Sequence, residues 1–190
     1  MGEGDSSSSS DKPLVLSKLR GTIQYDTLKE FMVHNTYIYP PRQLLLRVNA
    51  YVIGYASFNM PLFNSVSVLE YHMQEAGADT ALELVYTIAN GLEYVRTAVE
   101  VANLKVDDVA PILLFFWGIG MNFYTKIAKM RAGRRMWAKL KKERYQPQNS
   151  KLLLLISHCK TYGYYLMECQ PSNNVICATV EVMADFMGGT

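Results

Sequence analysis

Cysteine is scarce in this 190-residue sequence, and its pattern excludes two kinds of cross-linked scaffold. The three cysteines, Cys159, Cys169 and Cys177, are odd in number and form no C-x-x-C pair. A disulfide framework or a structural zinc site needs several cysteines at set spacings, so neither is expected. Unpaired thiols are typical of a reducing compartment, which predicts an intracellular protein. We also expect no metal site.

Long hydrophobic runs and nucleotide-binding motifs are also missing. No window reaches the roughly 18 consecutive apolar residues that span a bilayer, so we expect no membrane segment. Neither G-x-G-x-x-G nor G-x-x-x-x-G-K-[ST] occurs, which argues against a dinucleotide-binding fold and a nucleoside triphosphatase. The net charge of +2 is too small to imply a polyanionic partner.

The first thirteen residues contain a run of five serines, Ser6 to Ser10. They have no apolar core for a secretory signal and no arginine for an organelle transit peptide. We expect a solvated, Ser-rich tail over residues 1–13 and one ordered domain over residues 14–190.

Apolar residues switch between two spacings along that domain. Short β-branched or continuously apolar runs at 64–69, 111–117 and 152–157 predict buried strands. Spacings of three and four predict a short helix from Asp26 and longer ones over 43–58, 79–101, 122–145 and 174–187. The Asn90-Gly91 pair is a predicted weak point in its helix, and the last helix is expected to turn Val175, Ala178, Val182 and Phe186 inward. Such alternation predicts an α/β fold with a parallel sheet.

The helix predicted over 122–145 is strongly basic. Its only acid is Glu143, and it carries nine cations: Lys126, Lys129, Arg131, Arg134, Arg135, Lys139, Lys141, Lys142 and Arg144. One hypothesis is a nucleic-acid contact surface. The favoured one is a solvated outer face over an inner stripe of Ile127, Met130, Trp137 and Leu140, so we expect no nucleic-acid partner.

The pair Tyr71-His72 stands where the strand predicted at 64–69 ends and a helix begins. In α/β enzymes the reacting groups lie at the carboxyl ends of the strands. Taken alone, His72 is more typical of a structural histidine whose ring nitrogens are already bonded.

Several long motifs together resemble the methylmalonyl-CoA mutase family from about Leu19 to Thr190. They are Gly21-Thr-Ile-Gln24, Phe31-Met-Val33, Asn35-Thr-Tyr-Ile38, Tyr71-His-Met-Gln-Glu-Ala-Gly-Ala-Asp79, Gly91-Leu-Glu-Tyr94, Phe115-Phe-Trp-Gly-Ile-Gly-Met-Asn-Phe-Tyr124, Ile127-Ala-Lys-Met-Arg-Ala-Gly-Arg-Arg135 and Asn149-Ser150. The resemblance implies an incomplete (β/α)8 barrel with parallel strands and flanking helices. It also implies adenosylcobalamin as cofactor and an acyl-CoA as substrate. The family's D-x-H-x-x-G motif does not occur, so we expect no cobalamin-binding domain in these residues.

The resemblance also implies roles for individual side chains. His72 matches the histidine that hydrogen-bonds the substrate thioester carbonyl, and Tyr71 precedes it as in the family. Thr22, Ile23 and Gln24 match a substrate-contact loop. Asn64 and Phe116 match residues that line the acyl-CoA site.

Other family positions are altered here. His34 stands where the family has the arginine that pairs with the substrate's free carboxylate, and an imidazole cannot present a bidentate fork. Leu62 replaces a CoA-contacting lysine. Ile112 and Leu114 replace the ends of an Arg-Leu-Ser run, and Lys160 replaces a glutamine. Leu69-Glu70 replaces Ser-Gly just before Tyr71.

These matches and departures lead to one expected function and two alternatives. We expect a methylmalonyl-CoA mutase-like protein that as an isolated chain is inactive, because each lost charge-assisted contact costs roughly 1.5–3 kcal/mol. The first alternative is a non-enzymatic relic or a fragment that pairs with a full-length mutase subunit. The second is a nucleic-acid binder. The location expected for a eukaryotic family member is mitochondrial, although no transit peptide is visible.

Overall fold

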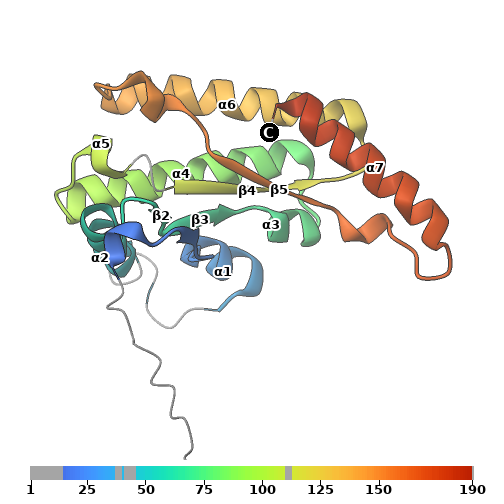
Figure 1. Ribbon diagram of the computed structural model, residues 1–190, viewed down its shortest axis with the longest axis horizontal. Helices are drawn as coiled ribbons and strands as arrows, with labels where there is room; N and C mark the ends of the chain where they lie inside the picture. Colours follow the sequence, from blue (N-terminus) through green and yellow to red (C-terminus); the bar gives the residue numbers. More distant parts are fainter. Residues whose placement is uncertain (1–14, 37–39, 41–45, 110–112, 190) are drawn as a thin grey trace, which may run out of the picture.

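A parallel sheet lies at the centre of the fold (Figure 1). The computed structural model describes residues 15–36, 40, 46–109 and 113–189. Its strands are β1 (Gly21–Thr22), β2 (Phe63–Asn64), β3 (Val66–Leu69), β4 (Leu113–Ile119) and β5 (Ser157–Thr161). The helices are α1 (Thr27–His34), α2 (Leu46–Asn59), α3 (Tyr71–Glu75), α4 (Thr80–Val101), α5 (Val106–Val109), α6 (Phe123–Tyr145) and α7 (Pro171–Gly188), with short 3-10 turns η1 (Leu16–Lys18), η4 (Ser150–Leu153) and η5 (Gly163–Tyr165). The predicted α/β class with parallel strands is confirmed.

The parallel strands follow one another in chain order. Strand β1 pairs with β2, and β3, β4 and β5 form a three-stranded sheet in that order. The strand predicted over 64–69 is divided at Ser65, because its first residues pair with β1 while its later ones pair with β4. Every residue of β3 is buried, as expected for a strand covered on both faces.

The third strand lies further along the chain than the sequence pattern predicts. The run 152–157 was expected to be a strand, but η4 occupies Ser150–Leu153 and the strand covers Ser157–Thr161. Lys141 donates to the Leu152 carbonyl, which helps to hold this turn against α6. Leu154 and Ile156 remain exposed, so apolar composition alone misplaced the strand. Strand β5 pairs only with β4 in the described sheet, and burial along it alternates.

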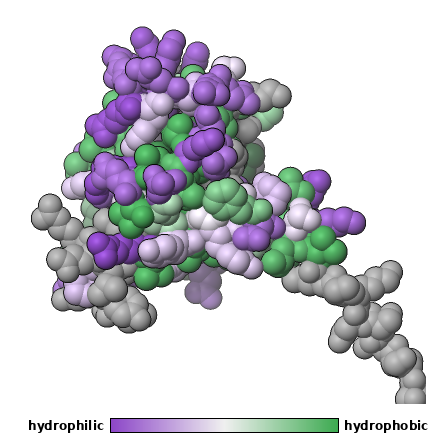
Figure 2. Space-filling model, turned by 90° about the vertical axis from the view of Figure 1, so that its left-hand side faces the viewer, coloured by the Kyte–Doolittle hydropathy of each residue, from purple (hydrophilic) through white to green (hydrophobic). Residues whose placement is uncertain are grey.

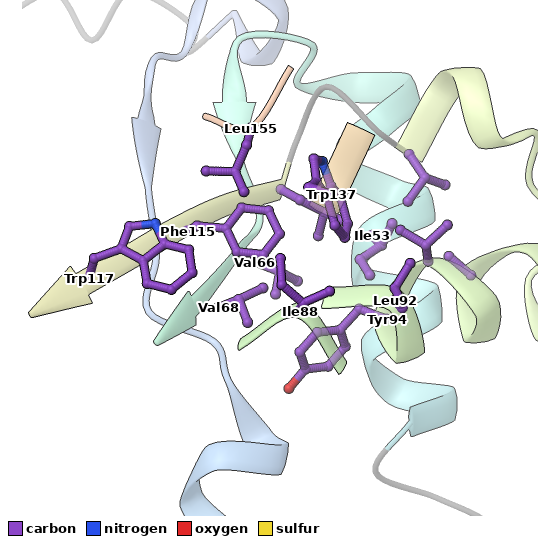
Figure 3. Packing of buried hydrophobic residues seen from close by; sticks show 14 of the residues in the cluster. Ile53, Val66, Val68, Ile88, Leu92, Tyr94, Phe115, Trp117, Trp137 and Leu155 are labelled. Carbon is purple, nitrogen blue, oxygen red and sulfur yellow. The ribbon is translucent and has the colours of Figure 1, made fainter. Parts of the chain in front are cut away.

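Helix α4 is continuous through Asn90-Gly91, where the sequence predicted a weak point. Its N-terminal cap is Asp79, whose side chain accepts from the amides of Ala81 and Leu82 at 2.9 and 2.8 Å. A Cβ on Gly91 would lie 2.8 Å from the ring of Phe115. The glycine therefore lets α4 approach β4 closely, in the aromatic core that Figure 3 shows around Phe115 and Trp137.

Helix α6 has the predicted length, but three of its cations do not lie on a solvated face. Lys126, Lys129 and Lys141 are buried. Lys129 donates to Glu83 Oε1 at 2.7 Å and to the Gly118 carbonyl at 2.6 Å, and Lys126 lies 3.3 Å from Glu83 Oε2. The prediction of nine outward cations was wrong for these lysines. Hydrophilic side chains do gather over the C-terminal end of α6, at the top of the face in Figure 2.

Helix α7 is rotated relative to its prediction. Of the four residues expected inside, Val175, Val182 and Phe186 are exposed and Ala178 is half-buried. Glu181, Ala184 and Gly188 form the buried side, where Gly188 packs on Met130 of α6. Small residues permit this close approach, and the apolar stripe is left outside. Across the described residues, no helix is long and apolar enough to cross a bilayer.

Candidate functional site

Tyr71 and His72 open α3 immediately after β3, at the carboxyl ends of the parallel strands. Asp26, the N-terminal cap of α1, holds this junction in place. Its Oδ2 accepts from the Leu69 amide at 2.7 Å, and its Oδ1 accepts from the Tyr94 hydroxyl at 2.7 Å. Burial raises the pKa of Asp26, and these hydrogen bonds oppose that shift. One side chain thus ties α1, β3 and α4 together beside the candidate site.

An aromatic cluster surrounds Tyr71. Its ring lies edge-on to Phe116 from β4 at 6.3 Å and to Tyr162, just after β5, at 6.0 Å between centroids. Lys160 Nζ lies 4.5 Å from the centre of the Tyr71 ring, a cation–π contact. Burial, with a contribution from Glu75, raises the pKa of Tyr71 to about 12. The phenol therefore stays neutral at physiological pH.

His72 is a half-buried imidazole with a charged neighbour. Lys29 Nζ lies 2.9 Å from His72 Nδ1, and the His34 ring lies 5.6 Å from the His72 ring between centroids. Burial lowers the pKa of His72, and electrostatic interactions with Lys29 and His34 lower it further. A neutral imidazole can donate one hydrogen bond from its remaining N–H.

The structure brings together several of the predicted positions. Tyr71, His72, Phe116 and the altered positions His34 and Lys160 lie in one group at the strand ends. His158 joins this group through Phe116, with 4.8 Å between ring centroids.

A second group lies along β1 and β2. Thr22 is the register partner of Asn64, and the Ile23 amide donates to the Asn64 carbonyl at 3.2 Å. Gln24 follows at the carboxyl end of β1, and Thr22, Ile23 and Gln24 are exposed. These contacts link the predicted loop and Asn64 to each other.

Two altered positions lie apart from His72 along the strands. Leu62 is exposed just before β2, and Leu114 is buried near the start of β4. Both are toward the amino ends of the strands. The altered position Ile112 lies outside the described residues.

Glu70, one of the two residues just before Tyr71, is fully buried. Neither of its carboxyl oxygens has a hydrogen-bond partner in the described part of the chain, and the nearby Thr87 hydroxyl donates instead to the Glu83 carbonyl at 2.6 Å. Burial raises the pKa of Glu70 well above its ordinary value, and the negative charges of Asp26 and Glu83 raise it further. An uncompensated carboxyl group therefore lies one residue before Tyr71.

Sequence reasoning missed Lys29 and the pocket beside α6. The contact between Lys29 and His72 joins residues 43 positions apart, and no local pattern signals it. The pocket has a volume of about 310 Å³, and its polar lining includes Gln74, Asp79, Asn122, Lys126 and Tyr162. Its position after β4 and β5 was the signal that could have indicated it.

The described side chains show no cluster of three or more histidine, cysteine, aspartate or glutamate residues suited to a metal ion. The imidazoles of His34 and His72 are engaged through Nδ1 with Glu30 and Lys29. These contacts leave Nε2 as the ring nitrogen of each imidazole that could act on a substrate.

Known proteins resemble this chain over nearly its whole length. The family model described as methylmalonyl-CoA mutase matches residues 8–190. Mitochondrial methylmalonyl-CoA mutases of Bos taurus and Homo sapiens are 59% and 57% identical over 173 residues. The methylmalonyl-CoA mutase large subunit of Streptomyces virginiae is 51% identical over 173 residues. Each alignment covers 91% of this chain but only 23% of the relative's length.

Proposed function

This chain belongs to the methylmalonyl-CoA mutase family, and on that premise we propose that it is a mutase-like protein that positions an acyl-CoA thioester at His72. One observation supports this best. His72 follows β3 at the carboxyl ends of the strands and lies in one group with Tyr71, Phe116 and His34, each at a family site position.

The chemistry of the site suits a thioester carbonyl. A neutral imidazole N–H can polarise that oxygen without acting as a strong acid or base. The family reaction, a cobalamin-dependent radical isomerisation of methylmalonyl-CoA to succinyl-CoA, requires such polarisation and the exclusion of water. Tyr71, held neutral between Phe116 and Tyr162, supplies an apolar wall beside the carbonyl. The role proposed for these residues is limited to the acyl-CoA.

The altered anchors limit what this site recognises. At His34 there is no guanidinium fork, and its Nδ1 lies 2.5 Å from Glu30 Oε2. Leu62 and Leu114 offer no charge to a CoA phosphate or pantetheine group. We therefore propose that the isolated chain binds acyl-CoA weakly, does not select a free carboxylate and does not turn over.

We also propose that residues 14–190 form an arc of a (β/α)8 barrel, preceded by the Ser-rich tail over residues 1–13. Support comes from the parallel segments that follow one another in chain order with helices between them. A mitochondrial location is proposed because the animal relatives are named as mitochondrial proteins.

One observation favours a second candidate function, pairing with a mutase subunit. The outer face of α7 exposes Val175, Ile176, Val182, Phe186 and Met187. An apolar stripe of this kind is typical of a surface that another part of a protein covers.

Calorimetric titration with matched ligands tests the main proposal. Methylmalonyl-CoA and propionyl-CoA differ by the free carboxylate, and the unmodified chain should bind both within about threefold of each other. His34→Arg should favour methylmalonyl-CoA by roughly 10- to 100-fold, since a charge-assisted contact contributes about 1.5–3 kcal/mol. His34→Lys adds charge without the fork and serves as the control.

Two further measurements complete the test. His72→Ala should weaken binding of propionyl-CoA roughly threefold to tenfold but leave binding of the S-propyl thioether analogue unchanged, because that analogue has no carbonyl. With adenosylcobalamin added, no succinyl-CoA should form. Equal losses for thioester and thioether, or turnover by the isolated chain, would contradict the proposal.

A further inference from the structure

Lys29 is a buried cation whose side chain is aimed at the candidate site. It lies in the first turn of α1, where its backbone amide donates to Asp26 Oδ1 at 3.0 Å. Only 4% of the residue is exposed, which is rare for lysine unless the ammonium group has partners. Its partners here are the Glu30 carboxylate and the His72 ring.

The contact with His72 fixes the position of the imidazole proton. Lys29 Nζ lies 2.9 Å from His72 Nδ1. An ammonium group has donors and no acceptor, so Nδ1 must accept this hydrogen bond with its lone pair. A neutral His72 then carries its proton on Nε2.

The Glu30 carboxylate compensates the positive charge of the buried Lys29. It pairs with Lys29 on one side and with His34 Nδ1 at 2.5 Å on the other. These contacts lower the pKa of Glu30 to about 2, with His34 the larger cause, so the carboxylate is charged at neutral pH. The negative charge balances Lys29 and leaves the adjacent imidazole uncharged.

From this geometry we propose that Lys29 is the positioning residue of the site: its ammonium group selects the Nε2–H tautomer of His72 and thereby aims an N–H donor at the acyl-CoA thioester. The role rests on the proposed function, because the thioester is the group that the donor serves. Lys29 acts through His72 and does not itself contact the substrate. In many metal sites, a hydrogen bond to one ring nitrogen of a histidine sets its tautomer and orients the other nitrogen toward the metal. The contact between Lys29 and His72 sets the tautomer in the same way without a metal.

Nitrogen NMR of the uniformly ¹⁵N-labelled chain tests the proposal without any ligand. At pH 7.5, His72 should show an unprotonated Nδ1 and a protonated Nε2, with the signals assigned by their loss in His72→Gln. Lys29→Met removes the donor and should move both nitrogen shifts toward a tautomer mixture. It should also raise the pKa of His72, because a nearby positive charge is lost.

The controls separate this role from folding and from the proposed function. Lys139→Met makes the same change at a side chain that is 72% exposed and should leave His72 unaltered. Lys29→Arg keeps a charged donor and should restore most of the Nε2–H signal. His158 reports any general change in the spectrum.

The outcomes are decisive in each direction. A His72 that carries its proton on Nδ1, or that is an even mixture in the unmodified chain, would overturn the assignment even if no variant folds. So would a Lys29→Met spectrum identical to that of the unmodified chain. The expected tautomer together with an absence of acyl-CoA binding would uphold the role of Lys29 toward His72 and reject the proposed substrate.

Discussion

The buried carboxyl group of Glu70 should make the stability of this protein depend steeply on pH. Glu70 is fully buried, has no hydrogen-bond partner in the described residues and lies near the acids Asp26 and Glu83. Its folded-state pKa is therefore raised, mainly by burial. In the unfolded chain the same group titrates at its ordinary value near 4.5.

The sign follows from proton linkage. Because the folded state holds its proton to higher pH than the unfolded state, the contribution of Glu70 to stability is fully present below pH 4.5. It is lost as pH rises toward the folded pKa. One extra bound proton corresponds to about 1.4 kcal/mol per pH unit.

Replacement by glutamine isolates this effect. Glu70→Gln keeps the shape of the side chain but cannot ionise, so any cost of its buried amide is independent of pH. In urea unfolding at pH 5, 6 and 7, the stability of Glu70→Gln relative to the unmodified chain should rise with pH, at up to about 1.4 kcal/mol per pH unit. Glu168→Gln changes an exposed glutamate and should show no such rise.

The comparison can also refute the reasoning. Parallel stability profiles for Glu70→Gln and the unmodified chain would mean that Glu70 ionises in the folded state as it does in water. Its carboxylate would then be solvated or paired, and the junction between β3 and α3 would carry no uncompensated charge.

Two more predictions concern Glu181 and Gly91. Burial raises the pKa of Glu181 to about 7, so its contribution to stability is present below pH 4.5 and is lost between pH 4.5 and 7. Glu181→Gln should therefore gain stability relative to the unmodified chain over that window and level off above it, and a constant difference in urea unfolding would contradict this. Gly91→Ala should cost about 1–2 kcal/mol despite the better helix propensity of alanine, because its Cβ would lie 2.8 Å from the Phe115 ring. Phe115→Leu in the same chain should reduce that cost, and additive losses would show that the ring is not the obstacle.

Local sequence signals predicted the helices better than the strands. The start of a helix at Asp26 and the three-to-four spacing of α4 and α6 depend on residues a few positions apart, and these predictions hold. An apolar run such as 152–157 has no such signature, because a buried strand and an exposed turn can share its composition. The position of β5 is set by pairing with β4, which brings Ser157 opposite Phe115.

The buried face of a helix depends on partners that its own sequence does not reveal. Lys126 and Lys129 look like solvent-exposed cations until Glu83 of α4 is placed beside them. In α7 the apolar stripe faces outward instead. The side that fits against α6 and the sheet carries Glu181 and the small residues Ala184 and Gly188. The pattern of polar and apolar residues therefore mispredicts the buried side of α6 and of α7, because tertiary contacts decide which side of each helix is covered.

The same limit applies to the site. The local pattern predicted the position of Tyr71-His72 after a strand, and the resemblance implied a role for His72. The tautomer of that histidine depends on Lys29, which is distant in sequence and close in space.

Two buried glutamates near these strand ends show why charge compensation matters to the site. Glu83 accepts from Lys129, Lys126 and the Gly118 amide, so its charge is compensated where it lies. Glu70 has no such partners, yet its backbone carbonyl accepts from the Met73 and Gln74 amides that begin α3. Ionisation of Glu70 therefore opposes burial at the residue that starts the helix carrying His72. Opening of the β3–α3 junction would expose the ionised Glu70 carboxylate to water and would move the His72 ring away from Lys29. Alkaline pH should therefore lower the stability of the fold and the fraction of His72 in the Nε2–H tautomer together.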